Sequence, residues 1–232
     1  MRFVKILLLG LGVVVVLIIM VAGYFGFVPG ISAVFGSNKP RDLGVVTSVE
    51  SYSAAAEKLA IIQTGDPITA EKIQYQGSHH VEVSLTSEEI SSLIANGKWK
   101  YNPISEGFQV KISPEGNVQV AGMLNRTRLD GYLKTNGFSE VLAYTSKFNV
   151  LPEKIPFALD GKASVVNNKV DLVLSKAEIG RVPLPTDAES VQYVERFVER
   201  RMTAVPGLNV QSLDFKDGKM NFTGSFPSTM GF

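Results

Sequence analysis

The feature that most constrains this chain is an uncharged run near its N-terminus, ILLLGLGVVVVLIIMVAGYFGFV, which extends from Ile6 to Val28. At 1.5 Å of rise per residue, a helix over this run is long enough to cross a hydrocarbon core of roughly 30 Å, which needs about 20 residues. A buried helix of a soluble protein would carry a polar stripe, and this run has none. The sequence therefore predicts a transmembrane anchor with a short cytoplasmic tip, together residues 1–28.

A cleaved secretory signal is the alternative interpretation of the same run. Its apolar region is usually shorter, about 7–15 residues, and Gly30-Ile31-Ser32 matches a cleavage site only loosely. We therefore favour a retained anchor. Because Arg2 and Lys5 precede the run and the first charge after it is Lys39, the positive-inside rule predicts a single-pass protein of the cell membrane. Its N-terminus would be cytoplasmic and its C-terminal domain extracytoplasmic.

The chain beyond the anchor is almost neutral. Without Arg2 and Lys5, 21 basic residues stand against 22 acidic ones, a net charge of −1. This balance argues against nucleic acid as a partner, because such binding rests on neutralising phosphates. The absence of cysteine excludes disulfides, thiolate catalysis and cysteine-based metal sites. Residues 29–44, PGISAVFGSNKPRDLG, are predicted to be a linker, and residues 45–232 suffice for one domain with a sizeable core or for two small ones.

The stretch VEVSLTSEEISSLIAN, residues 81–96, changes from a strand pattern to a helix pattern without a break. Apolar residues alternate up to Leu85 and recur at helical spacing from Ile90 onward. Between them, Thr86 and Glu89 have the spacing of a capping box, in which each side chain bonds to the backbone amide of the other residue. The sequence therefore predicts a strand that leads directly into a helix, with the helix crossing the apolar face of that strand.

Three pairs of alternating segments predict antiparallel hairpins. They cover residues 108–122 with a turn at 114–117, residues 156–180 with a turn at Asn167-Asn168, and residues 208–226 with a turn at Asp217-Gly218. A longer strand is expected over residues 73–85. Residues 126–148 are helix-like in pieces, with a break near Gly137.

Two further capping boxes predict helices. One starts at Thr47 and is followed by apolar residues up to Leu59, and the other starts at Thr186 and precedes the longest helix of the predicted domain. The apolar stripe of this long helix comprises Val191, Val194, Phe197, Val198 and Met202, whereas Glu195, Arg196, Glu199 and Arg200 occupy its other side. We expect the stripe to pack against the concave face of the sheet.

The segments 85–122 and 184–224 contain the same devices in the same order: a capping box, a helix, a strand, an acidic-Gly turn and a strand that ends at glycine. Chance similarity between common folding devices is the alternative, but two helix-hairpin repeats are the most economical description. Long antiparallel strands and amphipathic helices that cover them predict an α+β fold, in which a curved antiparallel sheet packs on the helices.

Residues suited to catalysis or metal binding are largely missing. His79 and His80 are the only histidines, and neighbours on a strand point to opposite faces, so they cannot share a metal ion. The G-x-S-x-G, G-x-G-x-x-G and P-loop motifs are absent. Scattered carboxylates leave glycoside cleavage open, although caps and turns explain nearly all of them. We predict no catalytic residues, no metal, no cofactor and no enzymatic activity.

Trp99 stands between two lysines in the segment GKWKYNPI. Such a tryptophan can sit at a membrane interface or beside an acidic headgroup. It can also plug the edge of a core, and we favour this interpretation.

Three segments carry a family resemblance: VSLTSEEISSLI, QVKISPEGNVQVAG and PGLNVQSLDFKDGKMNFTG. They resemble bacterial envelope proteins of the LmeA and YpmS type, which are related to the tubular lipid-binding (TULIP-like) superfamily. The shared steps fall on Leu85-Thr86, on Pro206-Gly207 and on Asp217-Gly218. The resemblance implies a curved antiparallel sheet wrapped on a long helix, an apolar groove for acyl chains and no catalytic residues.

The leading hypothesis is an anchored extracytoplasmic domain that binds or carries an amphipathic envelope lipid, such as a phospholipid. The residues predicted to line a lipid groove are Phe108, Val110, Val194, Phe197, Val198 and Phe222. Each of them could instead be an ordinary residue of the hydrophobic core. The alternative is a non-enzymatic adaptor that docks a cell-envelope protein through a sheet edge or through the Trp99 loop.

Overall fold

A computed structural model describes residues 2–138 and 152–232, with side chains from Val13 onward except those of Pro29 and Ser105. Its helices are α1 (Arg2–Tyr24), α2 (Pro29–Phe35), α3 (Val49–Leu59), α4 (Ser87–Ala95), α5 (Arg126–Thr135) and α7 (Ala188–Thr203). Its strands are β1 (Ile62–Thr64), β2 (Gln74–Gln76), β3 (His79–Thr86), β4 (Ile104–Ile112), β5 (Val118–Asn125), β6 (Lys154–Val166), β7 (Lys169–Ile179), β8 (Val182–Pro183), β9 (Asn209–Lys216), β10 (Lys219–Phe226) and β11 (Thr229–Gly231).

Among the residues whose side chains are described, no helix has both the length and the apolar character that are needed to cross a membrane. The span predicted over residues 6–28 lies partly outside these residues.

Eight strands form one antiparallel sheet in the order β3-β10-β9-β6-β5-β4, and β7 pairs with both β6 and β8. The three predicted hairpins are confirmed as β4–β5, β6–β7 and β9–β10. Asn167, Asn168 and Asp217 have positive φ, as tight hairpin turns require. The predicted fold class is therefore confirmed at the level of an α+β domain with a curved antiparallel sheet.

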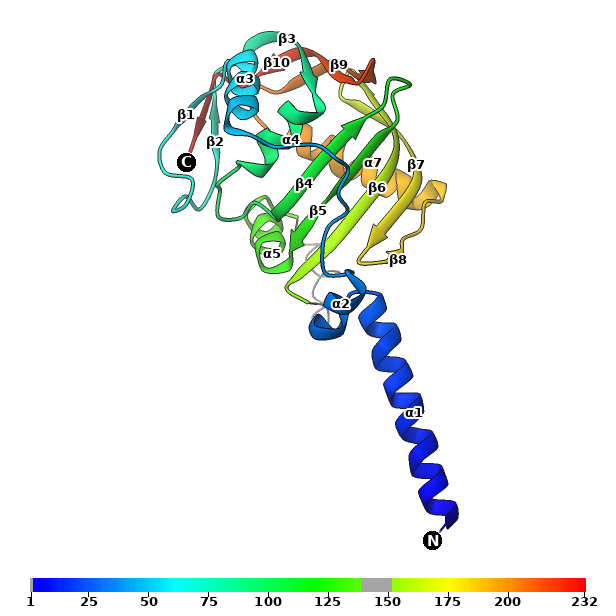
Figure 1. The fold of residues 1–232 in the computed structure, drawn as a ribbon. Helices are drawn as coiled ribbons and strands as arrows, with labels where there is room; N and C mark the ends of the chain where they lie inside the picture. The colour runs from blue at the N-terminus through cyan, green and yellow to red at the C-terminus, as the bar shows by residue number, and fades with distance from the viewer. Residues whose placement is uncertain (1, 139–151) are drawn as a thin grey trace.

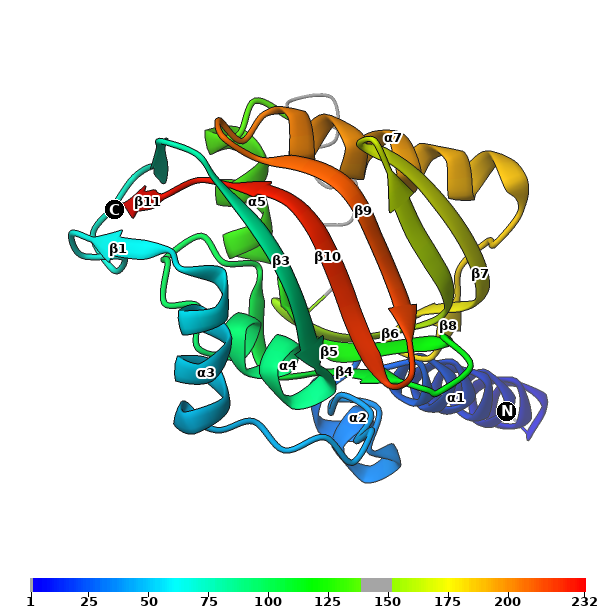
Figure 2. The same cartoon turned by 90° about the horizontal axis from the view of Figure 1, so that it is seen from above.

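The sheet curls into a half-barrel, which Figure 2 shows from above. The β9-β10-β3 part pairs with the rest of the sheet at the end of β6, where Val165 and Val166 pair with Leu213 and Ser212. The tips of two hairpins also meet, since the Asp217 amide donates to the Pro114 carbonyl at 3.1 Å. The two parts of the sheet thus meet at these junctions and face a common interior.

The free edge of β4 is closed by α4. The Ser91 hydroxyl accepts from the Val110 amide at 2.8 Å, and the Ser87 hydroxyl accepts from the Ile112 amide at 3.1 Å. The capping box of α4 is confirmed, because Thr86 and Glu89 bond reciprocally. α4 therefore starts where β3 ends, as predicted, but it packs mainly along the edge of β4 rather than across β3.

The orientation predicted for α7 is wrong. Its acidic residues do not face away from the sheet: the Glu195 carboxylate accepts from the Leu172 amide at 3.0 Å, and Glu199 accepts from the Val170 amide at 3.1 Å. None of the residues of α7 is fully buried. The physical reason is the free edge of β7, whose amides need acceptors, so that α7 lies along an edge and not across the concave face.

Several element boundaries differ from the sequence-based expectation. The N-caps of α3 and α7 are Ser48 and Asp187, each one residue after the predicted threonine. Their side chains accept hydrogen bonds from the backbone amides of Ser51 and Ser190. The strand expected over residues 73–85 is two strands, separated at Gly77, where φ is +69°. The helix after β5 ends at Thr135, and residues 139–148 of the predicted helical pieces lie outside the described residues.

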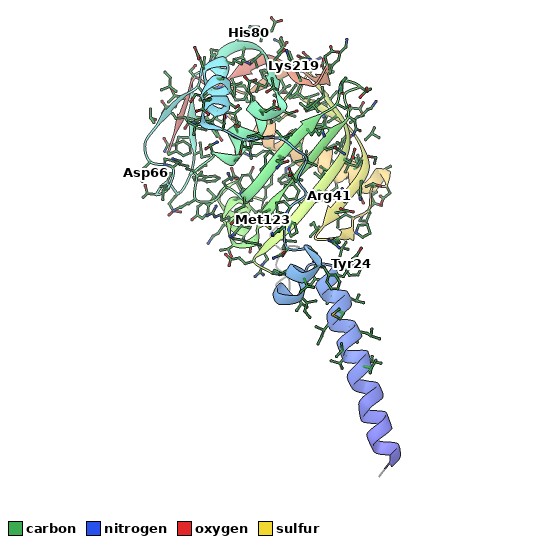
Figure 3. All side chains as sticks on the ribbon, in the orientation of Figure 1. Tyr24, Arg41, Asp66, His80, Met123 and Lys219 are labelled. Atoms are coloured by element: carbon green, nitrogen blue, oxygen red, sulfur yellow. The ribbon has the colours of Figure 1, made fainter. Side chains whose placement is uncertain are left out.

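The predicted linker is more ordered than its composition suggests. It contains α2 and then crosses the outer face of the sheet (Figure 1), where Arg41 pairs with Glu178 on β7 and the Leu43 amide donates to Gln109 on β4 at 2.6 Å. Figure 3 places Tyr24 at the junction of α1 with the domain. The Arg181 guanidinium lies 4.8 Å from the Tyr24 ring centroid. These contacts tie α1 and the linker to the sheet.

Candidate ligand cavity

Beside the curled sheet lies a partly open pocket with a purely apolar wall and a volume of about 270 Å³, which we call the inner chamber. Strands β3, β9 and β10 supply one wall, α4 supplies another, and Leu59 at the end of α3 completes it together with residues near the end of α7. The lining residues are Leu59, Leu85, Ile90, Leu93, Ile94, Met202, Leu208, Val210, Leu213, Met220, Phe222 and Phe226. Such a chamber offers a guest no hydrogen-bond partner from a side chain.

Local structure explains why these side chains point inward. On β3, the alternation of the strand buries Val81, Val83 and Leu85 on one side. On α4, Ile90 and Leu93 follow the cap at helical spacing, and they pack against the same buried cluster. The serines that hold α4 to the edge of β4 leave this apolar face turned toward the interior.

A second and larger space, the outer chamber, adjoins the first and has a volume of about 620 Å³. The two chambers share Leu93, Ile94 and Phe226 in their walls. The small sheet β1-β11-β2 contributes Gln63 and Met230 to the outer chamber. Here polar and aromatic side chains mix with apolar ones, so the outer chamber is amphipathic whereas the inner chamber next to it is apolar.

Aromatic residues stiffen the wall of the outer chamber. Trp99 is buried, its indole N–H donates to the Ala70 carbonyl at 3.0 Å, and its ring meets those of Tyr101 and Tyr132 edge to face at 5.5 and 6.1 Å between centroids. The interpretation of Trp99 as a residue at the edge of a core is therefore the one that the structure supports. Its indole also borders the outer chamber.

An ion pair lies just outside this wall. Lys100 pairs with Glu71, and the Tyr101 hydroxyl donates to the same carboxylate at 2.8 Å. Lys100 and Tyr101 together lower the pKa of Glu71, and Glu71 raises the pKa of Lys100. The charge of Lys100 is thus already compensated.

The structure does not bring the six predicted lining residues together. Phe222 is buried and lines the inner chamber. Phe108 and Val110 are buried in a neighbouring cluster on β4 and line neither chamber. On α7, Val194 and Val198 are 39% and 36% exposed, and the Phe197 ring packs against Phe138 at 4.8 Å between centroids. These α7 residues also lie outside both chamber walls, because α7 follows the sheet edge.

Apart from Phe222, the residues of the inner wall were not among the predicted lining residues, although the sequence pattern places several of them on one apolar face. Met220 and Phe226 share the inward face of β10 with Phe222, and Leu213 and Val210 lie on the neighbouring strand β9. An alternating strand pattern indicates which residues face inward. It does not indicate whether the interior they face is filled, and this depends on the curl of the sheet.

The histidines have structural surroundings. The His79 ring lies within hydrogen-bond distance of the Leu59 carbonyl at 3.0 Å and of the Ser228 hydroxyl at 3.4 Å, whereas His80 is exposed. The described residues contain no group of three or more His, Asp or Glu side chains that could hold a metal ion.

No protein-family model matches this chain, and neither a curated protein nor a solved structure is significantly similar to it.

Proposed function

We propose that this domain binds the acyl chain of an amphipathic envelope lipid and leaves the lipid chemically unchanged. The observation that carries the proposal is the inner chamber, whose twelve lining residues are all apolar. Water in such a space lacks polar partners, whereas an acyl chain that enters it removes apolar surface from water at about 25 cal/mol per Å². The outer chamber of about 620 Å³ falls within the usual range of ligand pockets, about 300–1,000 Å³.

We further propose that α1 is a single-pass anchor and that the domain is extracytoplasmic. The uncharged run of residues 6–28 and the basic residues that precede it support this orientation. Apolar side chains from Val13 to Val21 are exposed along α1, which projects from the domain in Figure 1. Exposed apolar surface of this extent is expected to be covered by lipid or by a partner.

The finer description of the fold, as a TULIP-like domain of the LmeA and YpmS type, belongs to the same proposal. The curled antiparallel sheet is compatible with it. The resemblance of the Leu85-Thr86 and Asp217-Gly218 steps adds support from the sequence.

The single tryptophan provides a direct test, because Trp99 borders the outer chamber. The full chain, kept in solution by a non-ionic amphipol, would be titrated with a fatty acid whose chain carries bromine, which quenches indole fluorescence on contact. We expect saturable quenching that an unbrominated fatty acid reverses. Lipids extracted from the purified protein would be identified by mass spectrometry. Absence of both saturable quenching and co-purified lipid would remove the basis of the proposal.

A matched pair of variants separates entry into the cavity from adsorption to the surface. Val210→Phe places a ring in the inner chamber, where the free volume receives it, and should weaken binding while the protein stays folded. Val166→Phe makes the same change at a position that is 59% exposed on β6, and should leave binding unchanged. Equal affinities of the two variants would place the amphiphile outside the inner chamber.

A second candidate function is a non-enzymatic adaptor for an envelope protein. The observation that favours it is the exposed apolar surface of α7, formed by Tyr193, Val194 and Val198. The edges of β4 and β7 are less suitable, because side chains already occupy their amides. Crosslinking in cells followed by identification of captured proteins tests this alternative. Recovery of lipid alone would leave the adaptor without support.

A further inference from the structure

The wall of the outer chamber contains one charged side chain, which is basic. Of its 18 lining residues, Lys98 is the only one with a charged side chain, and none is aspartate or glutamate. Within the described part of the chain, the ion pairs do not include Lys98, whereas Lys100, two residues further on, is paired with Glu71. A cation at the amphipathic end of an apolar cavity attracts an anion, and no aspartate or glutamate side chain lines the chamber to compete for it.

A second cation, Arg201, bonds to a residue of the same wall without lining the chamber itself. Arg201, on α7, donates from Nε to the Tyr132 hydroxyl at 2.7 Å and from Nη2 to the Tyr75 hydroxyl at 3.3 Å. Its guanidinium carbon also lies 5.7 Å from the Tyr132 ring centroid. Arg201 is half-buried, and its partners among the described residues are neutral. A half-buried cation without a carboxylate leaves a net positive field around these hydroxyls.

Tyr132 links Arg201 to the cavity, because Tyr132 bonds to Arg201 and is itself a lining residue of the outer chamber. Its hydroxyl oxygen accepts from Arg201, so its own proton remains available for a further acceptor. An acceptor that carries a negative charge would form the stronger bond. Lys98 and Tyr132 therefore both line the outer chamber, next to Trp99, and each carries a hydrogen-bond donor.

We propose that the ligand is an anionic amphiphile with one acyl chain. The chain points past Leu93 and Phe226 into the inner chamber, and the carboxylate or phosphate headgroup binds Lys98 and Tyr132. Arg201 is a positioning residue, which acts through Tyr132. This inference rests on the proposed lipid-binding function and adds the chemical class of the headgroup to it. One chain is expected because the inner chamber measures only about 270 Å³.

The test compares three amphiphiles that have the same brominated chain and differ only in the headgroup: the free fatty acid, the alkyl phosphate and the neutral monoacylglycerol. Each is titrated into the full chain in a non-ionic amphipol, and Kd is taken from the quenching of Trp99. We expect both anions to bind roughly tenfold more tightly than the neutral compound, the factor for a charge-assisted contact of moderate strength. Comparison of the two anions distinguishes a carboxylate from a phosphate headgroup.

Lys98→Gln should remove most of this preference and leave the melting temperature unchanged, because Lys98 is exposed. Lys100→Gln is the matched control: it removes an equal charge two residues away and should keep the preference. Tyr132→Phe should weaken binding of the anions and not of the monoacylglycerol.

Equal binding of all three amphiphiles to the unaltered protein would overturn the headgroup assignment and leave the lipid-binding proposal standing. Equal loss of the preference in Lys98→Gln and Lys100→Gln would also overturn it, because general surface charge would then explain the selectivity. If none of the amphiphiles quenches Trp99, the proposed function itself fails.

Discussion

Two phenylalanines on β10 allow the cavity to be tested through stability. Phe222 is 4% exposed, whereas Phe226 is half-buried, and their rings meet edge to face at 5.4 Å between centroids. Phe222 lines the inner chamber and not the outer one, but Phe226 belongs to the wall between the inner and outer chambers. Substitution by alanine therefore removes a packed ring at Phe222, whereas at Phe226 it removes part of the wall between the two chambers.

The expected costs follow from this difference. Replacement of a buried phenylalanine by alanine costs about 3–5 kcal/mol in a well-packed core. We expect Phe222→Ala to cost about 3 kcal/mol, at the lower end, because part of its ring already faces free volume. Phe226→Ala should cost about 1–2 kcal/mol, of which the aromatic pair accounts for about 0.5–1.5 kcal/mol.

Urea denaturation followed by Trp99 emission measures both costs, and the brominated fatty acid measures binding in the same samples. Phe226→Ala removes the partition, so we expect faster association of the acyl chain. A saturating ligand should in addition raise the stability of the folded state, by about 2.7 kcal/mol at a concentration of 100 Kd. A cost of 3 kcal/mol or more at both positions would refute the argument, since Phe226 would then lie in a sealed core.

Three further predictions concern the elements that hold the cavity wall. Folding lowers the pKa of Glu199 from its ordinary value of 4.5, because a lysine and a strand amide bond to its carboxylate. The ionised Glu199 therefore stabilises the fold above that pH, and this stabilisation is lost as the pH falls through the lowered pKa. Glu199→Gln should make the melting temperature less sensitive to acid. An unchanged decrease of the melting temperature at low pH would contradict this. Ser91→Ala should cost about 1–3 kcal/mol in urea denaturation, because the buried Val110 amide loses its acceptor, and a neutral result would show that water replaces the hydroxyl. Phe197→Ala should cost less than about 3 kcal/mol and leave acyl-chain binding unchanged, since the ring is half-buried and lines neither chamber; weakened binding would place α7 in the site.

The elements that the sequence predicted well depend on local interactions. The capping box at Thr86 and Glu89 satisfies helix amides within one turn, and the asparagine pair at 167–168 adopts positive φ in a two-residue turn. Alternation in the flanking strands then determines which residues face inward, as at Val83 and Leu85. Each of these features is decided by residues close together in the chain, so a sequence pattern is sufficient to find it.

The features that escaped prediction depend on distant partners. Glu195 and Glu199 look like solvent-exposed residues on a helical wheel, and only the position of β7 gives them strand amides to accept from. The small sheet is similar: β1 pairs with β11 in parallel, although the two strands come from distant parts of the chain. The volume of the inner chamber depends on how strongly the sheet curls, and no local pattern contains that information.

The two helices that bond to strand edges, α4 and α7, explain why the domain has unfilled space in its interior. In most α+β folds, helices lie across one face of the sheet and fill it. Here residues four apart on a helix bond to amides two apart on a strand edge, Ser87 and Ser91 on α4, and Glu195 and Glu199 on α7. The spacings agree, because four helical residues rise about 6.0 Å and two strand residues about 6.6–6.8 Å. A helix fixed to an edge in this way covers only part of the concave face, and the curl of β3, β9 and β10 then leaves apolar side chains facing free volume.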